Sequence, residues 1–231
     1  MNSLSEKVAL ITGVTGGLGV AVARAFLDAG ATVVGVSPKI DAAPVAGARF
    51  LPLAADIATP DGASQAARGA LELAGRIDAL IHLVGGFAGG KHVAETTDET
   101  WLKMLSLNLN TAFYMSRTIL PHMLAARRGR VVAVGSRTGV EPAAGLSAYG
   151  VSKAALIALV RTIAAEVRDS GITANVILPS VIDTPANRAA SPGADASKWV
   201  QSQSIASLLV WLASDAAADV NGAVIPIYGR A

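Results

Sequence analysis

The sequence predicts an α/β fold in which a doubly wound parallel sheet carries helices on both faces, and three observations lead to this prediction. Short apolar runs of strand length alternate with longer helical patterns along the whole chain. These runs lack strict alternation of apolar and polar residues, which is typical of strands buried on both faces of a sheet. Hydrophobic residues make up 52% of the 231 residues, enough to cover both faces of a large sheet.

The predicted elements follow one another in a regular order. A first apolar run at 7–12 stops at glycines, and a helical pattern follows it at 18–29. The β-branched run at 32–36 is the second strand, and Pro38 and Pro44 oppose a full helix in the short segment after it. Further strands are predicted at 79–84, 130–134 and 173–178, and further helices at 59–73, 97–126, 148–167 and 198–213. Such repeated βα units favour right-handed crossovers. The sequence shows no linker, repeat or low-complexity tract, so we expect one domain over residues 1–231.

The composition excludes several classes of function. The absence of cysteine excludes a disulfide framework, a thiolate metal site and a cysteine nucleophile. The histidines at 82, 92 and 122 lack metal-ligand spacing, so we expect no metal. A net charge of +2 gives a weak field and argues against a nucleic-acid partner. The first residues lack a signal-peptide pattern and no apolar run reaches about 18–20 residues, so we expect a cytoplasmic protein with no membrane partner.

A glycine-rich segment with the sequence TGVTGGLG, residues 12–19, follows the first predicted strand. Its glycines at 13, 17 and 19 permit a tight turn and let the backbone approach a pyrophosphate. The helix that follows offers free N–H groups and the positive end of its dipole to that anion. The segment therefore predicts a dinucleotide site, although a plain glycine turn between a strand and a helix has the same pattern.

Four polar residues are candidates for chemistry. The i, i+4 spacing of Tyr149 and Lys153 places both on one helical face, where a cation favours phenolate and lowers the phenol pKa. Alternatively, the two are surface residues that merely share a face. Ser136 follows the strand at 130–134, where its hydroxyl could reach a substrate oxygen or serve only in a loop. Asn108 interrupts a long apolar helical pattern and indicates a local kink, a water site or a satisfied core amide.

Taken together and in order, these pieces resemble the short-chain dehydrogenase/reductase family over nearly the whole chain, from Val8 to about Gly229. The matching pieces are Thr12-Gly-x-x-x-Gly-x-Gly19, Asp56-Ile57, Asn108, Ser136, Tyr149-x-x-x-Lys153, Pro179, Ile182-Asp-Thr-Pro185 and Trp211-Leu-Ala-Ser-Asp215. Each piece is weak alone, whereas the ordered set is highly specific. The resemblance implies a Rossmann fold and an NAD(P)-dependent oxidoreductase that interconverts a carbonyl and an alcohol of a small-molecule substrate by hydride transfer.

The resemblance also implies roles for single residues. Tyr149 would be the general acid/base, and Lys153 would hold the nicotinamide ribose while lowering the tyrosine pKa. Ser136 would orient the substrate oxygen, and Asn108 would hold a water in a proton relay. The residues implied to bind the cofactor are Gly13, Thr15, Gly17, Leu18, Gly19, Ser37, Lys39, Asp56, Ile57, Gly85, Tyr149, Lys153, Ile182 and Thr184.

The chain departs from the family pattern in several places, one of which is Pro179-Ser180 where the family has Pro-Gly. His82-Leu-Val-Gly85 replaces Asn-Asn-Ala-Gly, and we interpret His82 as a hydrogen-bonded core histidine rather than a catalyst. Tyr228-Gly-Arg230 replaces the usual terminal Asp-Gly-Gly. The family's substrate lid is reduced to the short segment 186–198, whose small residues suit a mobile loop and an open pocket. Because both asparagines are lost, a non-catalytic dinucleotide-binding sensor or scaffold is the alternative to a reductase. A related enzyme that catalyses epimerisation or dehydration is a third hypothesis.

The predicted cofactor is NADP rather than NAD. An acidic side chain at the end of the second strand would bind the ribose 2′-hydroxyl of NAD, but alignment with the family places Ser37 there. Lys39 could reach a 2′-phosphate or could be a solvated loop residue.

Two further expectations concern partners and substrate. The helices at 97–126 and 148–167 pair across a two-fold axis in the family, which implies a homo-oligomer, most simply a homotetramer. Arg137 and Arg188 could meet an acidic substrate or could simply be exposed to solvent.

Overall fold

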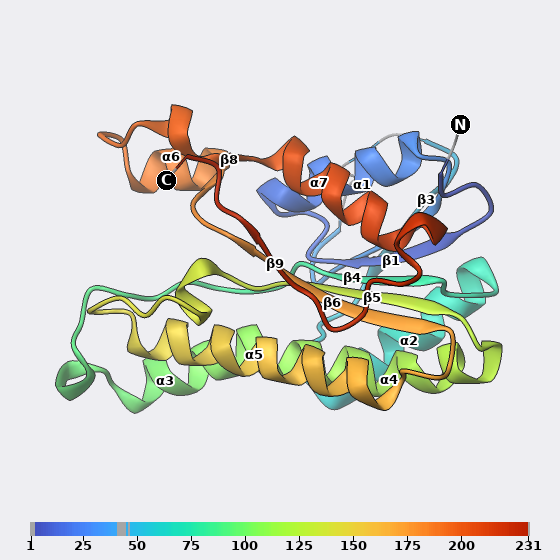
Figure 1. The fold of residues 1–231 in the computed structure, drawn as a ribbon, viewed down its shortest axis with the longest axis horizontal. Helices are drawn as coiled ribbons and strands as arrows, with labels where there is room; N and C mark the ends of the chain where they lie inside the picture. The colour runs from blue at the N-terminus through green and yellow to red at the C-terminus, as the bar shows by residue number, and fades with distance from the viewer. Residues whose placement is uncertain (1–2, 41–44, 46, 231) are drawn as a thin grey trace.

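A seven-stranded sheet runs through the middle of the molecule in the computed structural model, which describes residues 3–40, 45 and 47–230 (Figure 1). All neighbouring strands are parallel, and their order is β3-β2-β1-β4-β5-β6-β9. The strands are β1 (Val8–Thr12), β2 (Thr32–Ser37), β3 (Phe50–Ala54), β4 (Ala79–His82), β5 (Gly129–Val134), β6 (Ile172–Pro179) and β9 (Val224–Ile227). The order reverses between β1 and β4, as in a doubly wound Rossmann fold. The predicted fold class is therefore confirmed.

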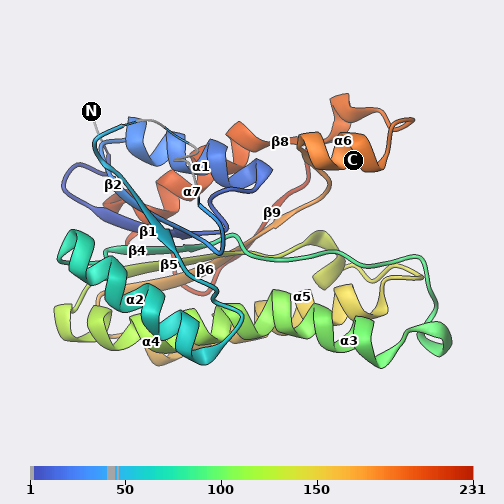
Figure 2. The same cartoon turned by 180° about the vertical axis from the view of Figure 1, so that it is seen from behind.

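Helices cover both faces of this sheet. One face carries α1 (Gly17–Asp28) and α7 (Ser202–Ala213), and the other carries α2 (Pro60–Ala74), α4 (Thr111–Ala126) and α5 (Ser147–Glu166) (Figures 1 and 2). In β1, Ile11 packs into the core cluster that contains Phe26 of α1, whereas Leu10 packs into the cluster that contains Leu156 of α5. Successive strand residues thus enter two different buried layers, which explains why the apolar runs do not alternate with polar residues.

The two edge strands, β3 and β9, are absent from the strands predicted above. Each contains a proline, Pro52 or Pro226, and each is only partly buried. Proline lacks a backbone N–H and is therefore tolerated at a sheet edge but not at its centre. A search for continuous apolar runs finds central strands and overlooks edges of this kind.

Two predicted helices differ from the observed ones. The segment 97–126 consists of α3 (Asp98–Leu105), a π-helical turn η2 (Ser106–Asn110) and then α4. The helix predicted at 198–213 begins only at Ser202, because the residues before it form η4 (Ala196–Lys198) and β8 (Val200–Gln201). Strand β8 pairs with β7 (Ile182–Asp183) in a separate small sheet. Between β2 and β3 the described residues contain no helix, as expected, and Pro44 lies outside the described residues.

Helix α5 is the one helix in the described part of the chain that is long and apolar enough to cross a membrane by length and composition. A core helix passes the same test, and Leu156 and Val160 of α5 are buried in the cluster beneath the sheet. The apolar character of α5 is therefore explained by packing.

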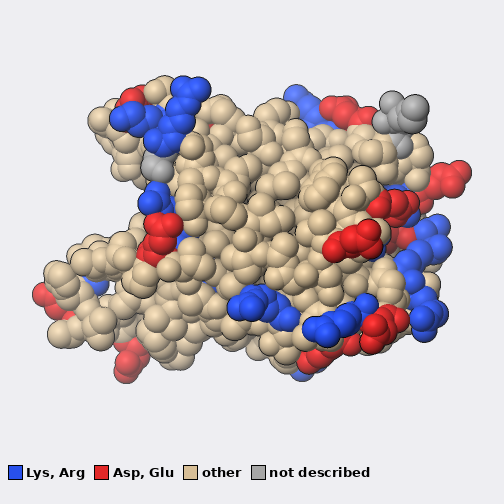
Figure 3. Space-filling model, in the orientation of Figure 1, with Lys and Arg blue, Asp and Glu red and all other residues tan. Residues whose placement is uncertain are grey.

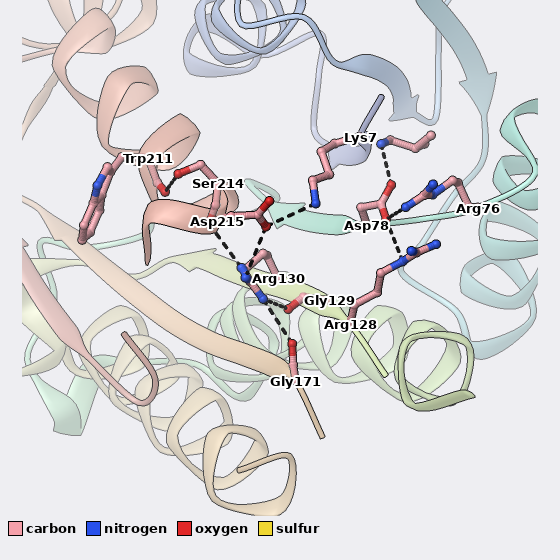
Figure 4. Close-up of polar contacts among 11 residues, drawn as sticks. Lys7, Arg76, Asp78, Arg128, Gly129, Arg130, Gly171, Trp211, Ser214 and Asp215 are labelled. Carbon is pink, nitrogen blue, oxygen red and sulfur yellow. Dashed lines mark hydrogen bonds and ion pairs between the residues drawn. The ribbon is translucent and has the colours of Figure 1, made fainter. Parts of the chain in front are cut away.

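Two aspartates organise the end of the sheet where the strands begin (Figure 4). Asp78, just before β4, accepts the N–H of Val8 at 2.9 Å and pairs with Arg128 at 3.5 Å; its side chain is only 8% exposed. Asp215, after α7, pairs with Lys7 at 3.2 Å but is 75% exposed. These contacts join the starts of strands and lie away from the carboxyl ends, so we assign them to stability.

Candidate active site

The predicted site residues gather at the carboxyl ends of the strands, where ligands bind in open α/β sheets. The glycine loop follows β1, Gly85 follows β4, and Ser136 follows β5. Figure 3 shows the molecule hollowed at this end, between the segment around α6 (Pro185–Ala190) and the loops on the opposite side.

The glycine loop has the close approaches that exclude side chains. Gly13 has φ +71°, and a Cβ on the buried Gly19 would lie 2.3 Å from the Gly13 carbonyl oxygen. A Cβ on Gly17 would lie 3.1 Å from Cβ of Thr184, so this loop directly faces the start of α6. Helix α1 begins at Gly17 without a side-chain cap among the described residues, which leaves its first N–H groups for an anion. The loop therefore fits a pyrophosphate.

The adenosine side is built from the ends of β2 and β3. Ser37 is buried, and its hydroxyl hydrogen-bonds that of Thr15 at 2.7 Å, which joins β2 to the glycine loop. Lys39 is exposed two residues further on. Asp56 is exposed and accepts the N–H of Ala58 at 3.0 Å, while its neighbour Ile57 is buried. The structure thus brings a serine, not an acid, to the end of β2.

Asn108 is buried in the π-helical turn η2, which interrupts the predicted helix at this position. Its Oδ1 accepts the N–H of Gly86 at 2.9 Å, and its Nδ2 donates to the Gly86 carbonyl at 3.1 Å and to Oγ of Ser152 at 2.9 Å. The Ser152 hydroxyl in turn donates to the Tyr149 carbonyl at 2.7 Å. The carboxamide is thus engaged by protein groups and ties the loop after β4 to the helical turn that carries Tyr149.

Ser152 is a site residue that the sequence analysis missed. The sequence feature that could have pointed to Ser152 is its position three residues after Tyr149, on the buried face of a predicted helix. Nothing in the sequence pairs it with Asn108, 44 positions away.

Lys153 follows Tyr149 by one turn of α5, and Ser136 is hydrogen-bonded to Tyr149. The Lys153 side chain is buried, Nζ donates to the carbonyl of Val134 at 2.9 Å, and burial lowers the pKa of its ammonium to about 8. Burial raises the pKa of Tyr149, and a hydrogen bond with the Ser136 side chain opposes that rise. We expected Lys153 to lower the phenol pKa. In this structure the phenol pKa is raised overall, the opposing contribution comes from Ser136, and the Lys153 ammonium is directed at the Val134 carbonyl at the end of β5.

His82 is a core histidine with both ring nitrogens satisfied. The Thr111 hydroxyl donates to the Leu107 carbonyl at 2.7 Å, so it must accept from Nε2–H of His82, 3.2 Å away. Nδ1 of His82 lies 3.1 Å from Oγ1 of Thr12, an oxygen that also accepts the N–H of Leu83. Burial lowers the pKa of His82 to about 3, so the ring is neutral and Nδ1 accepts from the Thr12 hydroxyl.

The segment before α6 is fixed by local hydrogen bonds. Thr184 caps α6 by accepting the N–H of Asn187 at 3.2 Å, and the Asn187 amide donates to the Ile182 carbonyl at 2.8 Å. Asp183, between them, holds Arg188 through two hydrogen bonds of 2.6 and 2.8 Å. Ile182 and Thr184 are therefore held in a defined conformation opposite the glycine loop.

The fold and this site define a class of protein, the nucleotide-dependent oxidoreductases with an open parallel sheet. The chain belongs to the short-chain dehydrogenase family, whose model matches residues 7–195. It is 29% identical to the 3-oxoacyl-(acyl-carrier-protein) reductase FabG of Salmonella typhimurium, over 98% of each chain. It is 31% identical to the uncharacterized oxidoreductase YvrD of Bacillus subtilis, over 98% of this chain and 96% of that one.

Solved structures agree. The crystal structure of levodione reductase matches with a TM-score of 0.89 and 26% identity, covering 98% of this chain and 97% of that one. The chain is therefore a short-chain dehydrogenase/reductase enzyme that acts on small molecules, and NAD(P) is the cofactor typical of its family.

Proposed function

We propose that this enzyme interconverts a carbonyl and an alcohol by hydride transfer, with Tyr149 as general acid/base. The observation that carries the proposal is the hydrogen bond between Ser136, after β5, and Tyr149, which lies one helical turn before the buried Lys153 on α5. The names of two relatives, a 3-oxoacyl-(acyl-carrier-protein) reductase and levodione reductase, support a carbonyl substrate.

The proposed roles follow from donors, acceptors and charge. NAD(P), when bound, supplies or accepts the hydride. In the reductive direction the Tyr149 hydroxyl donates a proton to the carbonyl oxygen, and Ser136 orients that oxygen by a second hydrogen bond. Lys153 would hold the nicotinamide ribose through its buried ammonium. Asn108 and Ser152 position the helical turn that carries Tyr149.

The groups that would hold the cofactor follow the cleft from end to end. Gly13, Gly17 and Gly19, with the uncapped start of α1, would hold the pyrophosphate. The residues proposed for the remaining contacts are Thr15, Leu18, Asp56, Ile57, Gly85, Ile182 and Thr184, and the conformation of the last two is fixed as described above.

The decisive experiment is the substitution Tyr149→Phe. Loss of the proton donor should lower kcat on the best carbonyl substrate by about 10²–10⁴-fold, whereas the cofactor dissociation constant should stay within about twofold. Tyr114→Phe on α4 is the matched control, and it should keep wild-type kcat. Wild-type turnover by Tyr149→Phe would overturn the proposal. Cofactor binding by the wild-type protein without turnover of any carbonyl would favour the sensor or scaffold instead.

We propose NADP as the preferred cofactor. The support is the buried Ser37 at the end of β2, where an acid would repel a 2′-phosphate, and the exposed Lys39 beyond it. Comparison of kcat/KM for NADPH and NADH tests this preference. Lys39→Glu should shift the ratio toward NADH, and Lys103→Glu on α3 should not. A clear preference of the wild-type enzyme for NADH would refute the proposal.

We also propose a homo-oligomer, most simply a homotetramer. Exposed apolar residues on α4 and α5, including Phe113 and Val151, suit self-complementary two-fold contacts. Light scattering at micromolar concentration tests this, and a monomer would refute it.

A further inference from the structure

Phe87 is an exposed aromatic ring beside the proposed acid/base. It lies in the irregular loop after β4, and its side chain is 69% exposed. Its ring meets the Tyr149 ring edge-to-face, with centroids 5.0 Å apart and planes inclined by 68°. A substrate whose oxygen reaches the Tyr149 hydroxyl would therefore carry its substituents past Phe87. The free face of this ring offers an apolar surface that water covers poorly.

The cationic side chain next to Ser136 is neutralised within the protein. Nε of Arg137 lies 2.6 Å from Oε2 of Glu141, and its guanidinium lies over the ring of Tyr228, 4.9 Å from the centroid. The Tyr228 side chain also hydrogen-bonds Glu141. Tyr228 reaches this place because β9 lies beside β6, whose end adjoins β5 and Ser136. Arg137 is therefore already paired within the protein.

The cationic side chain of α6 is neutralised in the same way. Arg188 makes a two-pronged contact with the carboxylate of Asp183, at 2.6 and 2.8 Å, and Asp183 also accepts from Gln201 of β8 at 3.1 Å. The guanidinium in turn holds the pKa of Asp183 below its ordinary value. A substrate carboxylate would have to displace Asp183 to use Arg188, and doing so would loosen the segment that carries Thr184.

We propose that the substrate is an uncharged ketone, or its alcohol, whose ring-sized apolar substituent lies on Phe87. The inference rests on the proposed function and assigns its substrate class. An anionic substrate would find both arginines already paired with Glu141 and Asp183, and a small aliphatic ketone would leave the Phe87 ring in water. An aryl or cycloalkyl ketone satisfies both conditions.

The first experiment measures the contribution of Phe87. In wild-type enzyme, kcat/KM should be higher for acetophenone than for 2-butanone. Phe87→Ala should lower kcat/KM for acetophenone by about tenfold, because an aromatic contact of this kind is lost, and should change the value for 2-butanone by less than about twofold. Leu73→Ala, which removes an exposed apolar side chain from α2, is the control and should leave both values unchanged.

The second experiment measures the charge selection. Methyl 4-acetylbenzoate and 4-acetylbenzoate differ in charge at a position remote from the carbonyl, and wild-type enzyme should prefer the ester. Glu141→Gln removes the partner of Arg137 and should shift the preference toward the carboxylate by about threefold, as expected for an exposed ion pair. Glu72→Gln on α2 is the charge-matched control and should leave the ratio at its wild-type value.

The outcomes separate the inference from the function on which it rests. Turnover of acetophenone that is insensitive to Phe87→Ala, or a wild-type preference for 4-acetylbenzoate over its ester, would refute the inference and leave the reductase intact. Failure of the wild-type enzyme to reduce any of these ketones, or to oxidise their alcohols, with either cofactor would refute both.

Discussion

The buried neutral histidine at the end of β4 makes the stability of this protein depend on pH. His82 has a pKa of about 3 in the folded protein, because burial disfavours the imidazolium, against an ordinary value of 6.5 in the unfolded chain. Between these values the unfolded chain binds a proton that the folded protein does not. The free energy of unfolding must therefore fall as the pH falls below 6.5, and the loss continues until about pH 3.

The magnitude follows from the same two pKa values. Each pH unit below 6.5 removes about 1.4 kcal/mol from the free energy of unfolding. At pH 5.0 this single group therefore lowers stability by about 2 kcal/mol relative to pH 7.5. The structural cause is the burial of the ring, and the Lys153 ammonium adds to it because a second positive charge nearby disfavours the imidazolium.

Urea unfolding followed by tryptophan fluorescence, at one protein concentration and at pH 7.5 and 5.0, tests this reasoning. The comparison uses wild type, His82→Asn, and His122→Asn as a control for an exposed histidine on α4. From pH 7.5 to pH 5.0, the free energy of unfolding should fall by about 2 kcal/mol more in wild type and in His122→Asn than in His82→Asn. An equal loss in all three proteins would refute the assignment, and His82→Gln serves if the asparagine variant fails to fold.

Two further predictions concern buried charge. Asp78→Asn should lower the free energy of unfolding by about 2–3 kcal/mol, because the 8% exposed carboxylate accepts the Val8 N–H and pairs with two arginines. Asp215→Asn, at a side chain that is 75% exposed, should cost less than about 1 kcal/mol, and equal losses in urea unfolding would contradict the difference in burial. The Lys153 pKa of about 8 predicts that the unliganded enzyme loses this cation above pH 8, so the dissociation constant of NADPH, followed by its fluorescence, should rise there. Lys153→Met should bind more weakly without that pH step, and a step that persists in this variant would refute the assignment.

The sequence by itself determined the central sheet and the class of enzyme. Every central strand is an apolar run because both faces of it are buried, and that condition is visible in the residues of one segment. The glycine loop after β1 and the interruption of the helix at Asn108 are also local, since a missing Cβ or an interrupted helical pattern can be read from neighbouring residues. The edge strands escaped prediction because they are only partly buried and each includes a proline.

Only the tertiary structure decided how the side chains of the cleft are paired. Asn108 bonds Ser152 and Gly86, and Arg137 rests on Tyr228, 91 positions further along the chain. It also decided that burial raises the pKa of Tyr149, where the spacing to Lys153 had suggested the opposite. Partners of this kind come from segments that meet because parallel strands end at one edge of a sheet. Hydrogen bonding, ion pairing and desolvation depend on distance in space, which no spacing along the sequence specifies.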